Sequence, residues 1–375
     1  MTATTSERPA FHPGVRRSPY FEETERAGAR EYLIYNHMYM PADYGHAGGE
    51  DYEALTTAVA LWDVGAERQV ELSGPDALRF ADYLVTSDLS ELTAGRCKYT
   101  FCCDERGVVI CDPVLLAVDS DMIWLSHGNI DLLLWAKGIA LHTSFDVKVT
   151  EPHVAPMQVQ GPRSQELMVG LVGASIAELP YYRCVRTQID GSDVVVSRTG
   201  WSGGLGYEIY PLDVDRALDI WHLVVEAGTP LGLVLAGPNV QRAMECGITD
   251  TSYYANLDAN ALEMGRPRAV DLDKGAFIGR EALREIAQRG PARTTVGLIG
   301  PAERLPRAQD VWRVMLGGHE VGQLRWSTFS PALQRAIAIA VLDRSAADVG
   351  TEVVVIHPGG ETPMTVTSLP FVRST

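Results

Sequence analysis

Hydrophobic and polar positions along the chain predict short strands and helices in mixed order, followed by a region of strands alone. Residues 68–86 (RQVELSGPDALRFADYLVT) alternate as a strand does, turn at Gly-Pro, and continue with apolar residues at helical spacing. Residues 154–173 (VAPMQVQGPRSQELMVGLVG) repeat the same strand, Gly-Pro turn and helix. This recurrence predicts two similar α+β units.

Other segments extend this pattern to the end of the chain. An irregular N-terminal segment precedes a helix expected over residues 50–65, and residues 98–118 read as a hairpin around Asp-Glu-Arg-Gly. A strand is expected over 121–128, a helix over 129–141 capped by Asn129, and further helices over 213–228 and 238–247. From about residue 291, short β-rich runs with Gly and Pro predict a C-terminal barrel or sandwich.

A glycine-rich stretch, RTGWSGGLGYEIY (residues 198–210), requires a backbone that turns tightly or approaches another group closely. Its last residues alternate as a strand, so the Glu208 side chain should point to the face opposite Tyr207 and Ile209. A carboxylate held in this way is well placed to accept hydrogen bonds from a ligand.

Composition and charge narrow the function. The 375 residues suggest two or three domains, and 46% apolar with 21% charged residues is typical of a soluble globular protein. A net charge of −16 argues against nucleic-acid or anionic-membrane partners. Without a signal-like N-terminus or an apolar run of spanning length, a cytoplasmic protein is expected. The six scattered cysteines fit no zinc pattern, so we expect buried thiols and no metal.

Several motifs, taken in order, resemble the aminomethyltransferase family, which includes the glycine-cleavage T-protein. The glycine-rich stretch resembles the family's Arg-(Thr/Ser)-Gly-Tyr-(Thr/Ser)-Gly…Gly-(Phe/Tyr)-Glu-(Ile/Leu)-Tyr motif. CDERGVVICDPVLL, VQGPRS, GPNVQRAMECG, NALEMG, FIGREAL, FSPALQRAIAIAVL and SLPFV resemble further family segments, so the resemblance covers almost the whole chain. YNHMYMPADY, WDVGAERQVELSG and LWAKGIAL are most similar to the dimethylsulfoniopropionate demethylase branch.

The resemblance implies an α+β fold of three domains in a ring, with tetrahydrofolate in the central channel. Two α+β domains are expected, one from residues 1–68 with 150–240 and one from 69–149 with 241–290, followed by a β-barrel over 291–375. The implied activity is the transfer of a one-carbon unit, as a whole methyl group in the demethylase branch, from a small-molecule donor to tetrahydrofolate. We expect a monomer or homodimer.

The resemblance also implies the residues that hold and use the cofactor. Glu208 matches the family's pterin-binding glutamate, and a carboxylate can accept two adjacent pterin N–H groups. Asp112 matches the catalytic aspartate, and Tyr99 a tyrosine that lines the site. Trp201 stands where the family usually has Tyr, and Tyr207 beside Glu208 is also expected at the cofactor. The alternatives are a solvent-facing Glu208, an Asp112 that bonds a backbone turn, and aromatic rings in plain core packing.

Two further candidates lie on segments that line the folate channel in the family. Arg242 and Glu245 are three residues apart on one helical face, and an intrahelical surface pair is the alternative to cofactor binding by Arg242. Glu263 matches the family's loop glutamate, although Ala261 replaces the usual proline.

The methyl donor stays open at this stage. A sulfonium or quaternary ammonium needs alignment, exclusion of water and an aromatic surround, which Tyr35, Tyr181 and Tyr182 would supply. An aryl methyl ether also needs a general acid, for which Tyr35 and His37 are the candidates, and His37 is otherwise a structural histidine.

Other classes of function remain to be separated from this one. A non-catalytic folate-binding protein of the same fold and an O-demethylase of methoxylated aromatic acids are the alternatives. A phosphate cradle at the glycine-rich stretch would need a helix directly after Gly206, where the pattern predicts a strand.

Overall fold

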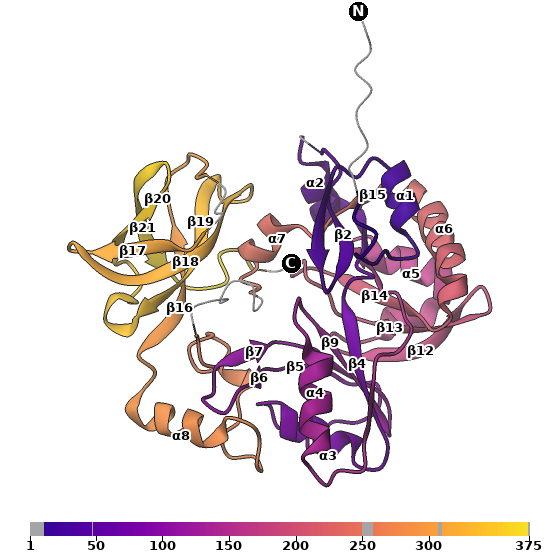
Figure 1. The fold of residues 1–375 in the computed structure, drawn as a ribbon. Helices are drawn as coiled ribbons and strands as arrows, with labels where there is room; N and C mark the ends of the chain where they lie inside the picture. Colours follow the sequence, from indigo (N-terminus) through magenta and orange to yellow (C-terminus); the bar gives the residue numbers. More distant parts are fainter. Residues whose placement is uncertain (1–10, 47, 250–257, 307–309, 374–375) are drawn as a thin grey trace, which may run out of the picture.

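The computed structural model of the chain describes residues 11–46, 48–249, 258–306 and 310–373. Its strands form two larger sheets, two short hairpins and a closed barrel, which Figure 1 shows grouped around the centre of the molecule. The α+β class and the C-terminal barrel are therefore confirmed. The domain boundaries at residues 68, 149, 240 and 290 stay a prediction.

The first sheet combines segments that are far apart in the sequence. It is antiparallel except that β15 runs parallel to β3, and its apolar side chains pack against α5 and α6. Leu61 and Val159 from the sheet join Trp221 of α6 in this core. In sheet order the strands are β12 (Cys184–Ile189), β13 (Ser192–Ser197), β14 (Gly206–Pro211), β11 (Met157–Gln160), β3 (Val59–Asp63) and β15 (Leu233–Ala236), with helices α5 (Ser164–Val172) and α6 (Ala217–Gly228).

The second sheet is antiparallel and repeats the strand-then-helix pattern of the first. Phe80 of α3 and Leu132 of α4 pack against Leu72 and Leu125 of the sheet. In sheet order the strands are β10 (Lys148–Thr150), β4 (Arg68–Ser73), β9 (Met122–His127), β8 (Val114–Asp119) and β5 (Cys97–Tyr99), with helices α3 (Ala77–Leu84) and α4 (Leu132–Leu141). The two predicted α+β units are therefore present.

The barrel closes on itself and leaves no free edge in its strand order. Its strands, in order, are β16 (Arg293–Ile299), β19 (Arg335–Asp343), β18 (His319–Ser330), β17 (Trp312–Leu316), β20 (Glu352–His357) and β21 (Gly360–Thr367). The hairpins are β1 (Glu31–Tyr35) with β2 (Met38–Asp43), and β6 (Cys102–Cys103) with β7 (Val109–Cys111). The other helices are α1 (Phe21–Arg26), α2 (Glu50–Thr57), α7 (Val240–Glu245) and α8 (Arg280–Arg289), with 3₁₀ turns η1 (Ala174–Glu178), η2 (Val214–Arg216), η3 (Thr229–Leu231), η5 (Pro267–Ala269) and η6 (Arg344–Ala346).

Two local predictions were wrong. The helix expected over residues 50–65 ends at Thr57, and Val59–Asp63 forms β3, because this fully buried apolar run pairs with strands on both sides. Asn129 does not cap α4, which begins at Leu132 after Asp131. Its side-chain oxygen instead accepts the backbone N–H of Asn36 over 2.7 Å and so fixes the turn of the β1–β2 hairpin.

The glycine-rich stretch closes around the side chain of Gln160. A Cβ at Gly200 or at Gly206 would lie 2.1 Å from the Gln160 amide, and Gly203 has φ +68°. Gln160 Nε2 donates to Thr199 O over 3.3 Å, and Ser202 Oγ donates to Gln160 Oε1 over 2.7 Å. The glycines therefore allow one buried amide to hold the loop that leads into β14.

Candidate active site

A cavity of about 450 Å³ lies where the two sheets, the β1–β2 hairpin and the barrel meet. Its wall takes Met40 from the hairpin, Glu208 from β14, Val114 from β8 and Trp326 from β18. Every major unit of the fold therefore contributes side chains to this one cavity.

Most of the residues singled out from the sequence come together in this lining. They come from β1, from β5, from the segment between β7 and β8, from the segment before β12 and from the glycine-rich stretch, and they are Tyr35, Tyr99, Asp112, Tyr181, Tyr182, Trp201 and Glu208. His37, Tyr207, Arg242 and Glu263 lie outside the lining. The cavity is therefore the candidate active site, and the roles of the residues in it stay a prediction.

Glu208 is held in place by the strands on both sides of β14. It is 7% exposed and lies opposite Gln158 on β11 and Ser197 on β13. Its Oε2 accepts from Tyr210 Oη at 2.5 Å, Thr199 Oγ1 at 2.8 Å and Ser197 Oγ at 3.3 Å, and its Oε1 accepts from Gln158 Nε2 at 2.8 Å. Burial raises the pKa of Glu208 above its ordinary value, although the three hydroxyl donors act to lower it.

The orientation of Glu208 was predicted correctly from the alternation of its strand. Tyr207 and Ile209 point into the apolar core between the first sheet and its helices, whereas Glu208 lines the cavity. For the same reason the Tyr207 side chain lies on the wrong face of the sheet to contact a ligand there. We therefore do not propose that Tyr207 contacts the cofactor directly.

Asp112 lies in the short connection between β7 and β8. It is 8% exposed, and Tyr99 Oη donates to its Oδ2 over 3.0 Å. Pro113 follows at once, and Thr100 N donates to its carbonyl oxygen over 3.2 Å. The aspartate and the tyrosine predicted at the site therefore form one hydrogen-bonded pair in the cavity wall.

Tyr181 and Tyr182 form an aromatic corner of the cavity. Their rings meet edge to face with centroids 4.7 Å apart, and Tyr182 adopts φ +60°. This left-handed conformation is unusual for a bulky residue and is held by hydrogen bonds from Cys97 N to Tyr182 O and from Tyr182 N to Arg198 O. Strain of this kind at a cavity wall is typical of a functional position.

His37 occupies the outer end of the β1–β2 turn. Asn36 and His37 have φ values of +48° and +62°, as a tight hairpin turn requires. The His37 side chain is 70% exposed and its Nε2 lies 3.4 Å from Asp131 Oδ1. An exposed side chain outside the cavity lining is poorly placed to act as a general acid for a ligand in the cavity. Of the two candidates for that role, His37 and Tyr35, only Tyr35 lines the cavity.

Arg242 and Glu245 form a buried pair, not the surface pair that their spacing suggested. Arg242 Nη1 lies 3.4 Å from Glu245 Oε2, which also accepts from Tyr52 Oη over 2.7 Å. Glu245 Oε1 accepts from Ser330 Oγ at 2.5 Å and from Ala332 N at 3.0 Å. The pair joins α7 to α2 and to the barrel, and Figure 1 shows α7 lying between these two parts. Because Arg242 is engaged in this pair, we do not propose that it binds the cofactor.

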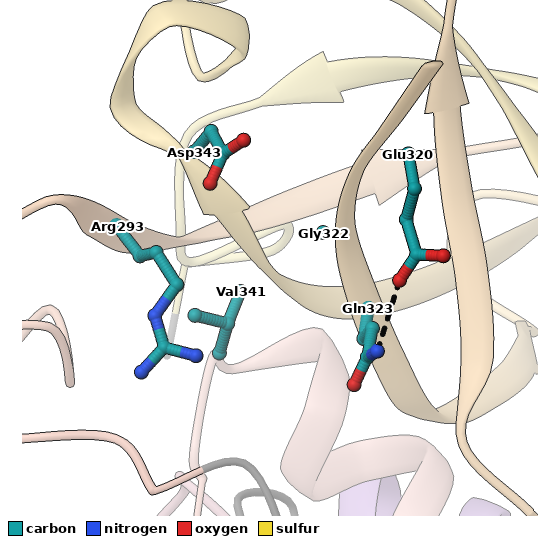
Figure 2. A pocket seen from close by; sticks show the side chains of 6 residues that line it. All are labelled: Arg293, Glu320, Gly322, Gln323, Val341 and Asp343. Atoms are coloured by element: carbon teal, nitrogen blue, oxygen red, sulfur yellow. Dashed lines mark hydrogen bonds between the residues drawn. The ribbon is translucent and has the colours of Figure 1, made fainter. Parts of the chain in front are cut away.

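Glu263 is likewise engaged away from the cavity. Its Oε2 accepts from Arg293 Nη2 at 2.8 Å and its Oε1 from Arg293 Nε at 3.1 Å. Arg293 also borders a second cavity of about 290 Å³ on the barrel, where Gln323 Nε2 donates to Glu320 Oε1 over 3.0 Å (Figure 2). Glu263 therefore anchors its loop to the barrel, and we do not propose that it contacts the cofactor directly.

Several lining residues were missed by the sequence analysis. Gln158 sits on a strand that is buried throughout, where a polar residue needs a partner, and this was the signal available. His127 ends β9, and Arg266 follows the loop whose glutamate was singled out. Arg266 is the only Lys or Arg among the described residues that line this cavity, and its Nη2 donates to Gly247 O.

Two other questions raised by the sequence are answered by the fold. Gly206 begins the strand β14 and no helix follows it, so the phosphate-cradle interpretation is wrong. Cys102 and Cys103 point into different cores, as their adjacency in a strand predicts.

Across the described residues, His, Cys, Asp and Glu form no group of three or more that could hold a metal ion. No helix in the described part of the chain is long and apolar enough to cross a membrane.

Comparison with known proteins agrees with this geometry. The GCVT N-terminal domain model matches residues 20–274, and the glycine cleavage T-protein C-terminal barrel domain model matches residues 293–373. Dimethylsulfoniopropionate demethylase DmdA of Ruegeria pomeroyi is 34% identical over 352 residues, which cover 94% of this chain and 96% of that protein. Aminomethyltransferase of Symbiobacterium thermophilum is 31% identical over 376 residues, covering 97% and 99%.

A solved structure shows the same fold. The crystal structure of glycine cleavage system aminomethyltransferase T from Bartonella henselae matches with a TM-score of 0.82 at 23% identity, covering 96% of this chain and 98% of that one. The fold expected from the resemblance, the T-protein fold, is therefore confirmed.

The fold and the family models together define an enzyme class, the one-carbon transferases that use tetrahydrofolate as the acceptor. The chain belongs to the aminomethyltransferase family of this class.

Proposed function

We propose that the protein transfers a methyl group from a small zwitterionic onium compound, with dimethylsulfoniopropionate the first candidate, to N5 of tetrahydrofolate. The observation that carries the proposal is the lining of the central cavity, where buried hydrogen-bond acceptors meet aromatic rings. A pterin offers several N–H donors, and an onium methyl group is attracted by aromatic faces.

The acceptors fit the cofactor. Glu208 carries its carboxylate into the cavity lining, and beside it Gln158 Oε1 is buried with no hydrogen-bond partner among the described residues. A buried acceptor without a partner costs free energy, which a ligand N–H group would recover. Glu208 and Gln158 therefore form a ready site for adjacent N–H groups, and tetrahydrofolate, when bound, supplies the nucleophilic N5 that accepts the methyl group.

Asp112 and Tyr99 are the residues that we assign to the transfer step. The Tyr99 hydroxyl fixes Asp112 Oδ2, so the carboxylate is oriented before any ligand arrives. A carboxylate in a wall of low exposure stabilises positive charge on a neighbouring ligand more strongly than it would in water. We assign to it the stabilisation of the methyl cation character as the group moves.

The side chains that line the cavity support the proposed donor class. Its aromatic side chains suit a sulfonium or quaternary ammonium, and they are Tyr35, Tyr99, Tyr181, Tyr182, Trp201 and Trp326. Arg266 supplies a cation for a carboxylate on the same donor or on the glutamate of the cofactor. An onium leaving group departs neutral and needs no general acid, and burial lowers the pKa of the nearby His127 to about 4.

Similarity to DmdA of Ruegeria pomeroyi and to the aminomethyltransferases supports the reaction class and leaves the donor to be tested. The test is a donor screen with tetrahydrofolate in which 5-methyltetrahydrofolate is measured by mass spectrometry. It compares dimethylsulfoniopropionate, glycine betaine, dimethylglycine and a methoxybenzoate. Product from an onium donor supports the proposal, product only from the methoxybenzoate replaces it with O-demethylation, and bound folate without product from any donor replaces it with a non-catalytic binder.

A further inference from the structure

His127 is a buried histidine in the cavity wall to which no role has yet been given. It is the last residue of β9, it is 3% exposed, and its neighbours Ser126 and Gly128 line the same cavity. It faces Arg68 across the β4–β9 pair, and Glu151 and Asp131 are the nearby carboxylates. The residue therefore faces charged neighbours toward β4 and also belongs to the lining of the central cavity.

One hydrogen bond fixes which ring nitrogen of His127 carries the proton. Nδ1 lies 2.8 Å from Gly128 O, and because a carbonyl oxygen can only accept, Nδ1 is the donor. Burial lowers the pKa of His127 to about 4, so the ring is neutral at physiological pH. Nε2 is therefore an unprotonated acceptor with a free lone pair.

That acceptor is buried and unsatisfied. Nε2 has no hydrogen-bond partner among the described residues, just as Gln158 Oε1 has none in the same lining. An apolar ring of similar shape would fill the space without this penalty. An acceptor kept in such a position next to a ligand cavity is best explained by a donor group that arrives with the ligand.

We propose that His127 is a specificity-determining residue whose Nε2 accepts a hydrogen bond from an N–H or O–H group of the ligand held in the central cavity. The inference rests on the proposed function for the identity of that ligand. Dimethylsulfoniopropionate and glycine betaine carry no N–H or O–H group, so the donor group belongs to tetrahydrofolate or to a different methyl donor. His127 and Gln158 would then accept hydrogen bonds from two separate donor groups of the ligand, in addition to the contact between the ligand and Glu208.

The direct test is nitrogen NMR on full-length protein labelled with ¹⁵N-histidine, with the His127 signals assigned from the spectrum of His127→Gln. In the free protein we expect the Nε2 signal of an unprotonated nitrogen, unchanged between pH 5.5 and 8. Tetrahydrofolate alone is added in one arm. Dimethylglycine, whose ammonium carries an N–H, and a 4-hydroxy-3-methoxybenzoate are added in others, with glycine betaine as the matched ligand that lacks an N–H.

Each outcome has one meaning. An upfield shift of Nε2 with tetrahydrofolate assigns the contact to the cofactor, and a shift with only dimethylglycine or the hydroxybenzoate assigns it to the methyl donor. Tetrahydrofolate binding seen by calorimetry, with no Nε2 shift in any arm, overturns the inference and leaves the proposed function standing. No folate binding at all overturns the proposed function, and the Nε2 shift with the other ligands then decides the inference separately.

Variants give a second measurement. His127→Phe should weaken the affinity for the ligand identified by NMR by roughly threefold to tenfold, and His127→Gln, which keeps an acceptor, should lose less. His319→Phe makes the same change at an exposed position of the barrel and should leave the ligand affinity unchanged. Equal affinity of the wild type and His127→Phe would overturn the inference, and the spectra of the wild type keep it testable if the variant folds poorly.

Discussion

Gln158 and Glu208 are Cα partners on neighbouring strands, and Gln158 Nε2 donates to Glu208 Oε1 over 2.8 Å. The amide both holds the carboxylate and presents its own unpaired oxygen beside it. Two acceptors at this spacing are prepared before a ligand binds, which lowers the entropy lost on binding. This pair is the structural basis for the assignment of the cofactor site.

Replacement of Glu208 tests that assignment. Glu208→Gln removes the charge from the contact to pterin N–H groups and should weaken tetrahydrofolate binding by roughly tenfold to a hundredfold in calorimetry. Glu166→Gln makes the same change on α5, where Glu166 pairs with Arg163 at the surface, and should leave the affinity unchanged. Unchanged folate affinity in Glu208→Gln would remove the pterin assignment.

Asp112 should act on the rate of transfer more than on binding. Asp112→Asn keeps the shape of the side chain but not its charge, so kcat should fall roughly a hundredfold or more while folate affinity changes by less than about threefold. Stopped-flow single turnovers and calorimetry measure the two quantities.

Tyr99→Phe is the matched variant for Asp112, because it removes only the hydroxyl that donates to Asp112 Oδ2. It should lower kcat by roughly tenfold or less, through a carboxylate that is less well oriented. Equal losses of rate and of folate affinity in Asp112→Asn would make Asp112 a simple cofactor contact.

The buried Asp63 predicts a specific dependence of stability on pH. Burial raises the pKa of Asp63 from 3.8 to about 6, against the hydrogen bonds from Ser18 Oγ and Gly65 N. The folded state therefore binds more protons than the unfolded state between these values, and this contribution to stability, complete below pH 3.8, is lost as the pH rises through about 6.

Asp63→Asn removes this titration while it keeps the shape of the side chain. Urea unfolding at pH 4.5 and at pH 7.5 should show the variant gaining on the wild type by about 2 kcal/mol between the two pH values. Parallel pH profiles for the two proteins would show that Asp63 does not titrate in this range.

The Arg242–Glu245 pair should matter for stability. Glu245→Ala leaves the buried Arg242 and the Tyr52 and Ser330 hydroxyls without their shared acceptor, so the free energy of unfolding should fall by about 3–5 kcal/mol. Glu281→Ala, which removes an exposed partner of Arg284, should cost less than about 1 kcal/mol. A similar small cost for both variants would contradict the structural role of the pair.

Local sequence patterns predicted the structure correctly where the pattern of a single strand determines it. The glycines and the alternation after them predicted the turn, the strand β14 and the direction of Glu208. The same reasoning failed at Val59–Asp63, because periodicity cannot distinguish a buried strand from a buried helix in a short apolar run. Partners on both sides, β11 and β15, decide that segment.

Contacts between distant segments could not be predicted from spacing. Arg242 and Glu245 pair as their spacing suggests, but their burial depends on the barrel and on α2. His127 and Arg266 reach the cavity only because the hairpin, both sheets and the barrel meet there. The resemblance to the family supplied the cofactor, and the fold supplied the additional lining residues.

The most direct test of the central claim follows one methyl group. The protein is incubated with tetrahydrofolate and dimethylsulfoniopropionate that carries deuterated S-methyl groups, and the folate is analysed by mass spectrometry. We predict 5-methyltetrahydrofolate with three deuterium atoms, formed with catalytic turnover by the wild type and roughly a hundredfold or more slowly by Asp112→Asn. Saturation with folate but no deuterated product from this or any other onium donor would contradict the account.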